Sequence, residues 1–188
     1  MSSDSHPVHP ATVHFPIAFL SLAYALDILY GLSTHPSSAK IVASIYDTAP
    51  FLGDMARSSY YLSLLGVITG IPAILSGGQQ LMGMLKKQDM ANKLQKSQNK
   101  SATVQKMHPK LKIAFLHAAL NDVAIVGTGY HWWTRRAIAG NAPTETGVLV
   151  SAGLFFSLLF SAFLGGKLVY EHGVGVLRAG EASRVKSQ

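Results

Sequence analysis

Two stretches of this sequence run for the width of a membrane without a charged residue. Residues 58–85 and 146–166 contain no Asp, Glu, Lys or Arg. A helix needs about 20 apolar residues to cross the hydrocarbon core of a bilayer, whereas a soluble helix of that length keeps a charged face in water. Only 13% of the chain is charged, against roughly 25% in soluble domains. Both stretches are therefore predicted to span a membrane.

Two weaker apolar segments complete the set. Residues 14–33 are apolar apart from Asp27 near their end, and residues 111–133 contain several polar side chains. Helices are the expected structure because backbone amides in lipid must be satisfied within their own segment. We predict an all-α fold, a polytopic membrane four-helix bundle, with spans at about 14–33, 58–85, 111–133 and 146–172. The alternative is a large, fully buried helical core.

The domain organisation follows from these spans. A His- and Pro-rich lead covers residues 1–13, one membrane domain covers residues 14–173, and a tail covers residues 174–188. A Lys-rich loop, residues 86–110, joins the second and third spans. The first apolar segment is a full span without a basic region before it, so we do not expect a cleaved signal peptide.

Lysines and arginines are unevenly distributed between the loops. An even number of spans places both termini on one side, together with loop 86–110. Twelve of the 16 basic residues fall on that side, and basic residues that flank spans are retained in the cytoplasm. We therefore predict that both termini and the loop face the cytoplasm or an equivalent inner compartment. The glycosylation sequon at Asn99 should then stay unmodified.

The basic excess also bears on partners. It lies beside the spans, so membrane retention and attraction to anionic lipid explain it. Loop 86–110 contains no Phe, Tyr or Trp for stacking on bases. We expect anionic lipid at this loop, within a lipid bilayer, and no nucleic acid. A homo-oligomer and a membrane redox partner remain open.

Enzyme motifs are missing from the sequence. The chain has no cysteine, which excludes disulfides and thiolate chemistry. It also lacks a Gly-x-Ser-x-Gly elbow, a phosphate loop and a His-Glu-x-x-His helix. We assign no catalytic residue and do not expect a stand-alone enzyme.

Histidines are concentrated at the predicted cytoplasmic side. Spans one and three run outward and spans two and four return, so His14 begins the first span and His117 lies one to two turns into the third. His172 ends the fourth span. Helices from separate parts of the chain thus bring imidazoles to one membrane depth, and we predict a shared polar layer there.

Such a layer suits a cofactor or a metal ion. Imidazole is the commonest metal ligand, and paired histidines on facing helices can ligate haem iron axially. The alternative is that these histidines cap helix ends, which is also our interpretation of the terminal His6-x-x-His9 pattern. The candidate cofactor-binding residues are His14, His117, Asn121, Tyr170 and His172; the candidate metal ligands are His9, His14, His117 and His172.

Two carboxylates lie within the predicted spans. Intramembrane ionisable residues are costly and are functional candidates by default, which makes Asp27 and Asp122 notable. On a helical wheel Asp27 points away from His14 and belongs to another layer. Its structural alternative is an ion pair with Arg57 or Arg135 near the opposite interface.

The second span carries a stripe of small and polar residues. Small residues let membrane helices approach closely, so we interpret the stripe as a packing surface, with a cleft for a flat cofactor as the alternative. Its members recur at spacings of three and four: Ser63, Gly66, Gly70, Ala73, Gly77 and Gln80.

Three segments resemble the signature blocks of a known family. They are HPVHPATVHFPIAFLSLAYALD (residues 6–27), HAALND (residues 117–122) and GGKLVYEHGVGV (residues 165–176). In this order they are similar to the DUF2231 family of small four-span membrane proteins. The resemblance implies a four-helix membrane domain, sometimes associated with redox modules, and no settled activity. The matching positions are His9, Pro10, His14, Pro16, Asp27, His117, Asn121, Gly165, Gly166, Tyr170, Gly173 and Gly175.

Three functions are compatible with these features. The first is an integral membrane protein whose histidine layer binds haem b or a metal ion in a redox role. The second is a non-catalytic membrane scaffold or assembly factor in which the histidines hold helices together. The third is a conductor of protons or small solutes, which four short spans without an inverted repeat make less attractive.

Overall fold

The structure, a computed structural model, describes residues 8–98 and 107–174. Every regular element in these residues is a helix, as the sequence predicts. The elements in chain order are α1 (Val8–Thr12), α2 (His14–Thr34), α3 (Ala39–Ile45), η1 (Ala49–Phe51), α4 (Leu52–Gln98), α5 (Pro109–Arg135), η2 (Ala139–Asn141) and α6 (Glu145–Tyr170).

Four helical stretches are long and apolar enough to cross a membrane. They are Val8–Thr34, Ala49–Gln98, Pro109–Arg135 and Ala139–Tyr170. Large apolar side chains such as Leu22, Val126 and Phe156 point outward from the bundle, where a soluble protein would place charge. This pattern confirms the predicted four-span membrane architecture.

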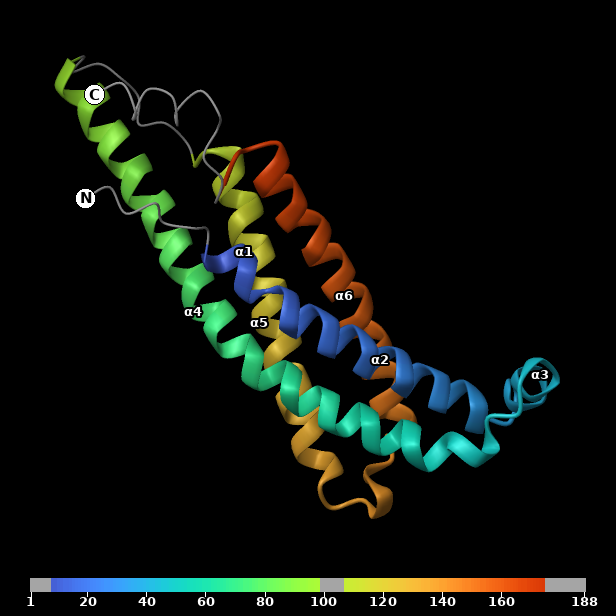
Figure 1. Ribbon diagram of the computed structural model, residues 1–188. Helices are drawn as coiled ribbons and strands as arrows, with labels where there is room; N and C mark the ends of the chain where they lie inside the picture. The colour runs from blue at the N-terminus through green and yellow to red at the C-terminus, as the bar shows by residue number, and fades with distance from the viewer. Residues whose placement is uncertain (1–7, 99–106, 175–188) are drawn as a thin grey trace.

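The four long helices form an up-and-down bundle. α2 packs on α4 and α6, and α5 packs on the same two helices, so consecutive long helices are neighbours. Figure 1 shows α1, the end of α4, the start of α5 and the end of α6 at one end of the bundle, and α3 projecting from the other. Which end faces the cytoplasm stays a prediction.

Helix α4 is longer than the predicted span. The uncharged stretch 58–85 lies inside a 47-residue helix, which at about 1.5 Å per residue is roughly 70 Å long. Lysines are good helix formers once outside lipid, so the helix continues into the Lys-rich segment as far as Gln98. The sequon at Asn99 lies outside the described residues.

The small residues of α4 form a packing surface. Ser63, Gly66, Gly70 and Ala73 are buried. A Cβ atom at Gly66 would collide with the Leu20 side chain, and one at Gly70 with that of Ile125. The absence of side chains here lets α2 and α5 approach α4 closely, in agreement with the predicted packing role.

A buried ionic cluster joins the long helices near the α3 end. Asp27 of α2 is 0% exposed and Arg135 of α5 is 1% exposed, and Arg135 Nη1 donates to Asp27 Oδ1 at 3.0 Å. Ser151 Oγ of α6 donates to Asp27 at 2.7 Å, and His131 Nε2 lies 3.2 Å from the same carboxylate. Arg135 Nη2 donates to Ser59 Oγ of α4 at 2.8 Å. We call these five residues the Asp27 cluster.

The Asp27 cluster contains the ion pair that the sequence offered as the structural role of Asp27. The carboxylate pairs with Arg135, one of the two partners expected from the sequence. All three guanidinium nitrogens of Arg135 donate hydrogen bonds to neighbouring groups. Its Nε also donates to the Asn141 carbonyl at 2.8 Å, whereas the next residue, Arg136, lies exposed over the Trp133 ring. Arg135 is therefore part of the core, and Arg136 is the residue at the surface.

Candidate functional site

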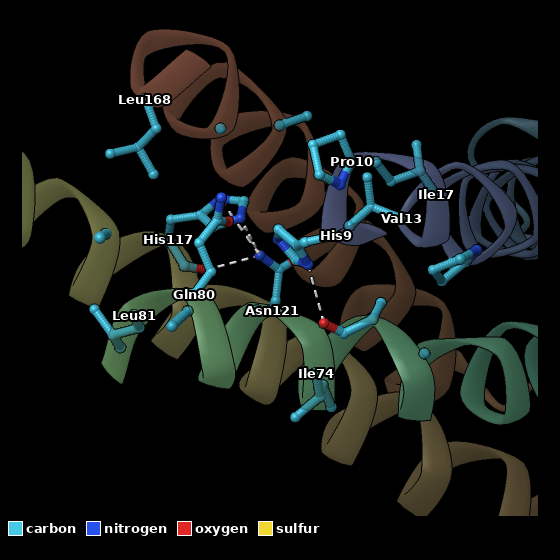
Figure 2. Close-up of a pocket in the computed structure, with 18 of the residues that line it drawn as sticks. His9, Pro10, Val13, Ile17, Ile74, Gln80, Leu81, His117, Asn121 and Leu168 are labelled. Atoms are coloured by element: carbon cyan, nitrogen blue, oxygen red, sulfur yellow. Dashed lines mark hydrogen bonds between the residues drawn. The ribbon is translucent and has the colours of Figure 1, made fainter. Parts of the chain in front are cut away.

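A cavity opens between the helices at the α1 end of the bundle. Its volume is about 480 Å³, which is within the range of small-molecule sites, about 300–1,000 Å³. Residues of α1, α2, α4, α5 and α6 line it, and most of its wall is apolar. Figure 2 shows Val13, Ile17, Ile74, Leu81 and Leu168 around the polar side chains of His9, His117 and Asn121.

His9 is placed by the short helix α1, which packs on α4. Its Nδ1 lies 3.1 Å from the Ala73 carbonyl and 3.2 Å from Ser76 Oγ, both on α4. Because a carbonyl oxygen can only accept, the Nδ1 atom donates and carries the proton. The other ring nitrogen, Nε2, then has a free lone pair.

His117 of α5 is held in the same way by α6. Its Nδ1 lies 2.9 Å from the Ser161 carbonyl and 3.0 Å from Ser161 Oγ. The Nδ1 atom again donates to the carbonyl, which leaves the Nε2 atom of His117 deprotonated. Each imidazole is thus fixed through one nitrogen by the backbone of a neighbouring helix.

Asn121 lies beside His117 without using its Nε2 lone pair. The Asn121 amide donates to the His117 carbonyl at 2.8 Å and to Ser161 Oγ at 2.7 Å. An amide nitrogen has two hydrogens, and these two short bonds employ both. The longer approach of Asn121 Nδ2 to His117 Nε2, 3.3 Å, is therefore a contact and leaves the nitrogen available.

The two imidazoles face the same space. Their ring centroids are 6.4 Å apart and their planes make an angle of 81°. Glycines make room for both rings: a Cβ at Gly77 would lie 2.8 Å from His9 Cε1, and one at Gly165 would lie 3.1 Å from His117 Cε1. Gly77, in the α4 stripe of small residues, therefore makes room for the His9 ring.

The other predicted site residues lie at or beyond the edge of the cavity. His14 lines its wall with an exposed side chain, and Tyr170 stands at the rim, 90% exposed. His172 follows the end of α6 and is not among the lining residues. Asp122 is exposed on the α5 side of the wall.

The predicted set of metal ligands is not assembled as one group. Within residues 8–98 and 107–174, no three side chains of His, Cys, Asp or Glu come close enough to hold a metal ion. His9 and His117 meet because α1 (Val8–Thr12) packs on α4 and places His9 at the cavity. His14 lines the cavity with an exposed side chain, and His172 comes after α6 has ended.

Sequence reasoning finds some groups of this site and misses others. His9 is among the candidate metal ligands, although the His6-x-x-His9 pattern favoured a helix cap, and Ser161 lies four residues before Gly165 on one face of the fourth span. The main-chain oxygens of Ala73 and Ser161 carry no sequence signal. Ser76 was missed, although it lies one residue before Gly77 of the small-residue stripe.

Chemically, this arrangement offers two imidazole nitrogens in an apolar cavity. Metal-binding histidines commonly donate their second ring nitrogen to a carbonyl, which fixes the ring and its tautomer. His9 and His117 both show this feature. The cavity therefore combines apolar walls with two oriented electron-pair donors.

Comparison with known proteins agrees with the fold. A family model described as "Predicted membrane protein (DUF2231)" matches residues 5–178, which include all four membrane-length helices. No match was found among curated proteins or among solved structures. The chain is an integral membrane protein, and it belongs to the DUF2231 family of predicted membrane proteins.

Proposed function

We propose that this protein binds haem b in the cavity at the α1 end, with His9 and His117 as the two axial ligands, and that it serves in electron transfer. The observation that carries the proposal is the pair of imidazoles, each anchored through Nδ1 and each with Nε2 free. Their ring centroids are 6.4 Å apart, close to the roughly 6 Å between the centroids of two imidazoles that would share one metal with bonds of about 2 Å.

The number of ligands favours haem over a bare metal ion. A structural metal site in protein needs about four donor side chains, and the described residues offer no group of three. A porphyrin supplies four nitrogens itself, so two imidazoles complete its coordination. The apolar wall of the cavity also suits a macrocycle better than a hydrated ion.

Two axial imidazoles suit a redox role. When bound in this way, haem iron undergoes one-electron oxidation and reduction and keeps no open position for a substrate. Here the chain supplies the two ligands, their orientation through the Ala73 and Ser161 carbonyls, and an apolar surrounding. A membrane redox partner, which the sequence left open, is then required.

The core next to the cavity disfavours the conductor hypothesis. Leu20, Leu154 and Leu158 form a buried cluster with Tyr24. On α6, Leu154 and Leu158 stand between Ser161 at the cavity and Ser151 of the Asp27 cluster. These leucines separate the two polar regions along the bundle, and protons or solutes need a polar path.

The test is a titration of the protein with haem. The full chain, purified in mild detergent, is titrated with ferric haem while visible spectra are recorded. We expect one haem per chain with a six-coordinate, low-spin spectrum in both oxidation states. His9→Ala and His117→Ala should each convert it to a high-spin spectrum, whereas His35→Ala, an exposed histidine at the other end of the bundle, should not.

Two outcomes would contradict the proposal. One is a wild-type spectrum identical to that of haem in empty micelles. The other is a low-spin spectrum that neither His9→Ala nor His117→Ala changes. If both variants keep their fold and no haem binds to the wild type, the scaffold hypothesis becomes the better account of the histidines.

A further inference from the structure

A second, more polar groove adjoins the cavity. It lies between α1 and α4, has a volume of about 270 Å³, and is lined by Val8, His9, Pro10, Ser76, Gln79 and Gln80. Three of these residues, His9, Pro10 and Gln80, also line the cavity. Figure 2 shows His9 between Pro10 and Gln80, with Gln80 next to His117. A single ligand can therefore contact both spaces.

The groove and the α5 side of the cavity differ in charge. The groove residues include two primary amides, Gln79 and Gln80, and no acid. Lys86 and Lys87 follow these glutamines by seven residues each, which places them on the same face of α4 about 10 Å further along. On α5, the exposed Asp122 carboxylate also lines the cavity. An anionic group is thus favoured in the groove and disfavoured near Asp122.

We propose that the groove between α1 and α4 is the subsite for an ionised carboxylate of the ligand in the cavity, with the amides of Gln79 and Gln80 as hydrogen-bond donors. This inference rests on the proposed function, because haem b carries two carboxylates on one edge of an apolar ring. With His9 shared between the two spaces, the ring lies in the cavity and its carboxylate edge enters the groove.

The subsite fixes the direction of the ligand. Gln79 and Gln80 lie near the end of the uncharged stretch of α4, where the helix leaves the membrane, so the carboxylates remain within reach of water. A ligand carboxylate placed beside Asp122 would instead meet a like charge, which repels it. Gln79 and Gln80 are positioning residues, since they act on the edge of the ligand and not on its iron.

The experiment compares haem with its dimethyl ester, which has the same iron and ring but no ionisable carboxylate. Both are titrated into the full chain in detergent, and affinity and visible spectrum are recorded. Hydrogen bonds to a charged acceptor are strong, so we expect the free acid to bind at least about tenfold more tightly than the ester. Both ligands should give the same low-spin spectrum, because His9 and His117 are unchanged.

Two variants test whether the groove causes the tighter binding of the free acid over the ester. Gln79→Leu combined with Gln80→Leu should bring the two affinities to within about twofold of each other while the low-spin spectrum persists. Gln95→Leu, on the exposed end of α4, should keep the wild-type preference. Equal affinity of the wild type for acid and ester, with both low-spin, would overturn this subsite and leave the haem site intact. Failure of the wild type to bind either ligand would overturn both proposals.

Discussion

At the α3 end of the bundle, Asp27, His131 and Arg135 are packed against one another; at the α1 end, His9 and His117 face a cavity. Both regions draw polar side chains from several helices. In the first, Asp27 accepts from Ser151 and Arg135 and contacts His131, and little space remains. In the second, one nitrogen of each imidazole is anchored and the other is free. Polar groups that are all hydrogen-bonded to one another hold a membrane bundle together. Imidazole nitrogens with a free lone pair in a cavity are available to bind a ligand.

The largest effect is expected from Arg135→Ala in the Asp27 cluster. Removing the guanidinium leaves the buried carboxylate of Asp27 without its charged partner, a loss of about 3–5 kcal/mol. Unfolding in mixed micelles of a mild detergent and dodecyl sulfate measures the change. Arg136→Ala is the matched control, because its side chain is exposed over Trp133 and should cost about 1 kcal/mol or less. Equal losses for the two variants would show that the Asp27 cluster does not hold the bundle.

A comparison of two histidines sharpens the difference between the regions. His131→Ala removes a neighbour of a buried carboxylate, which should destabilise the protein by about 1.5–3 kcal/mol. His9→Ala removes a neutral, partly buried hydrogen bond, which should cost about 0.5–1.5 kcal/mol. The same micelle unfolding assay measures both. A greater loss for His9→Ala would mean that the α1 end, and not the Asp27 cluster, is the structural centre.

The smallest effect is expected for Ser161→Ala. Ser161 Oγ accepts from Asn121 and lies beside His117 Nδ1, so its removal should cost about 1 kcal/mol and weaken haem binding by a few-fold through a less fixed imidazole. Ser157→Ala, one turn earlier on α6, is the control, since Ser157 Oγ is buried without a hydrogen-bond partner among the described residues. A stable, fully haem-binding Ser161→Ala protein would exclude a role for the Ser161 hydroxyl in orienting His117 and leave that role to the Ser161 carbonyl.

The sequence predicted the fold better than the site, and the residues show why. Uncharged stretches such as 58–85 identify helices because lipid excludes charge along a whole span. The pairing of His9 with His117 depends on how α1 folds back onto α4, and the carbonyls of Ala73 and Ser161 that orient the rings have no sequence signature. The sequence predicted a common depth for His14 and His172, but depth alone does not determine which face a side chain occupies.

Several expectations from the sequence stay predictions. The cytoplasmic location of the termini and of loop 86–110 rests on the distribution of lysines and arginines along the sequence. The interaction of the Lys-rich segment with anionic lipid has the same basis, although α4 does carry Lys86 and Lys87 beyond the uncharged stretch. Residues 99–106, in the middle of the loop, lie outside the described part of the chain.

The central claim is that the free nitrogens of His9 and His117 meet at one metal with their rings nearly perpendicular. Electron paramagnetic resonance of the ferric, haem-loaded protein tests it most directly, because the angle between axial imidazole planes determines the anisotropy of the low-spin signal. The observed angle of 81° predicts a strongly anisotropic low-spin signal that is lost in both His9→Ala and His117→Ala. A high-spin signal in the wild type, or the rhombic low-spin signal of parallel imidazoles, would contradict the account.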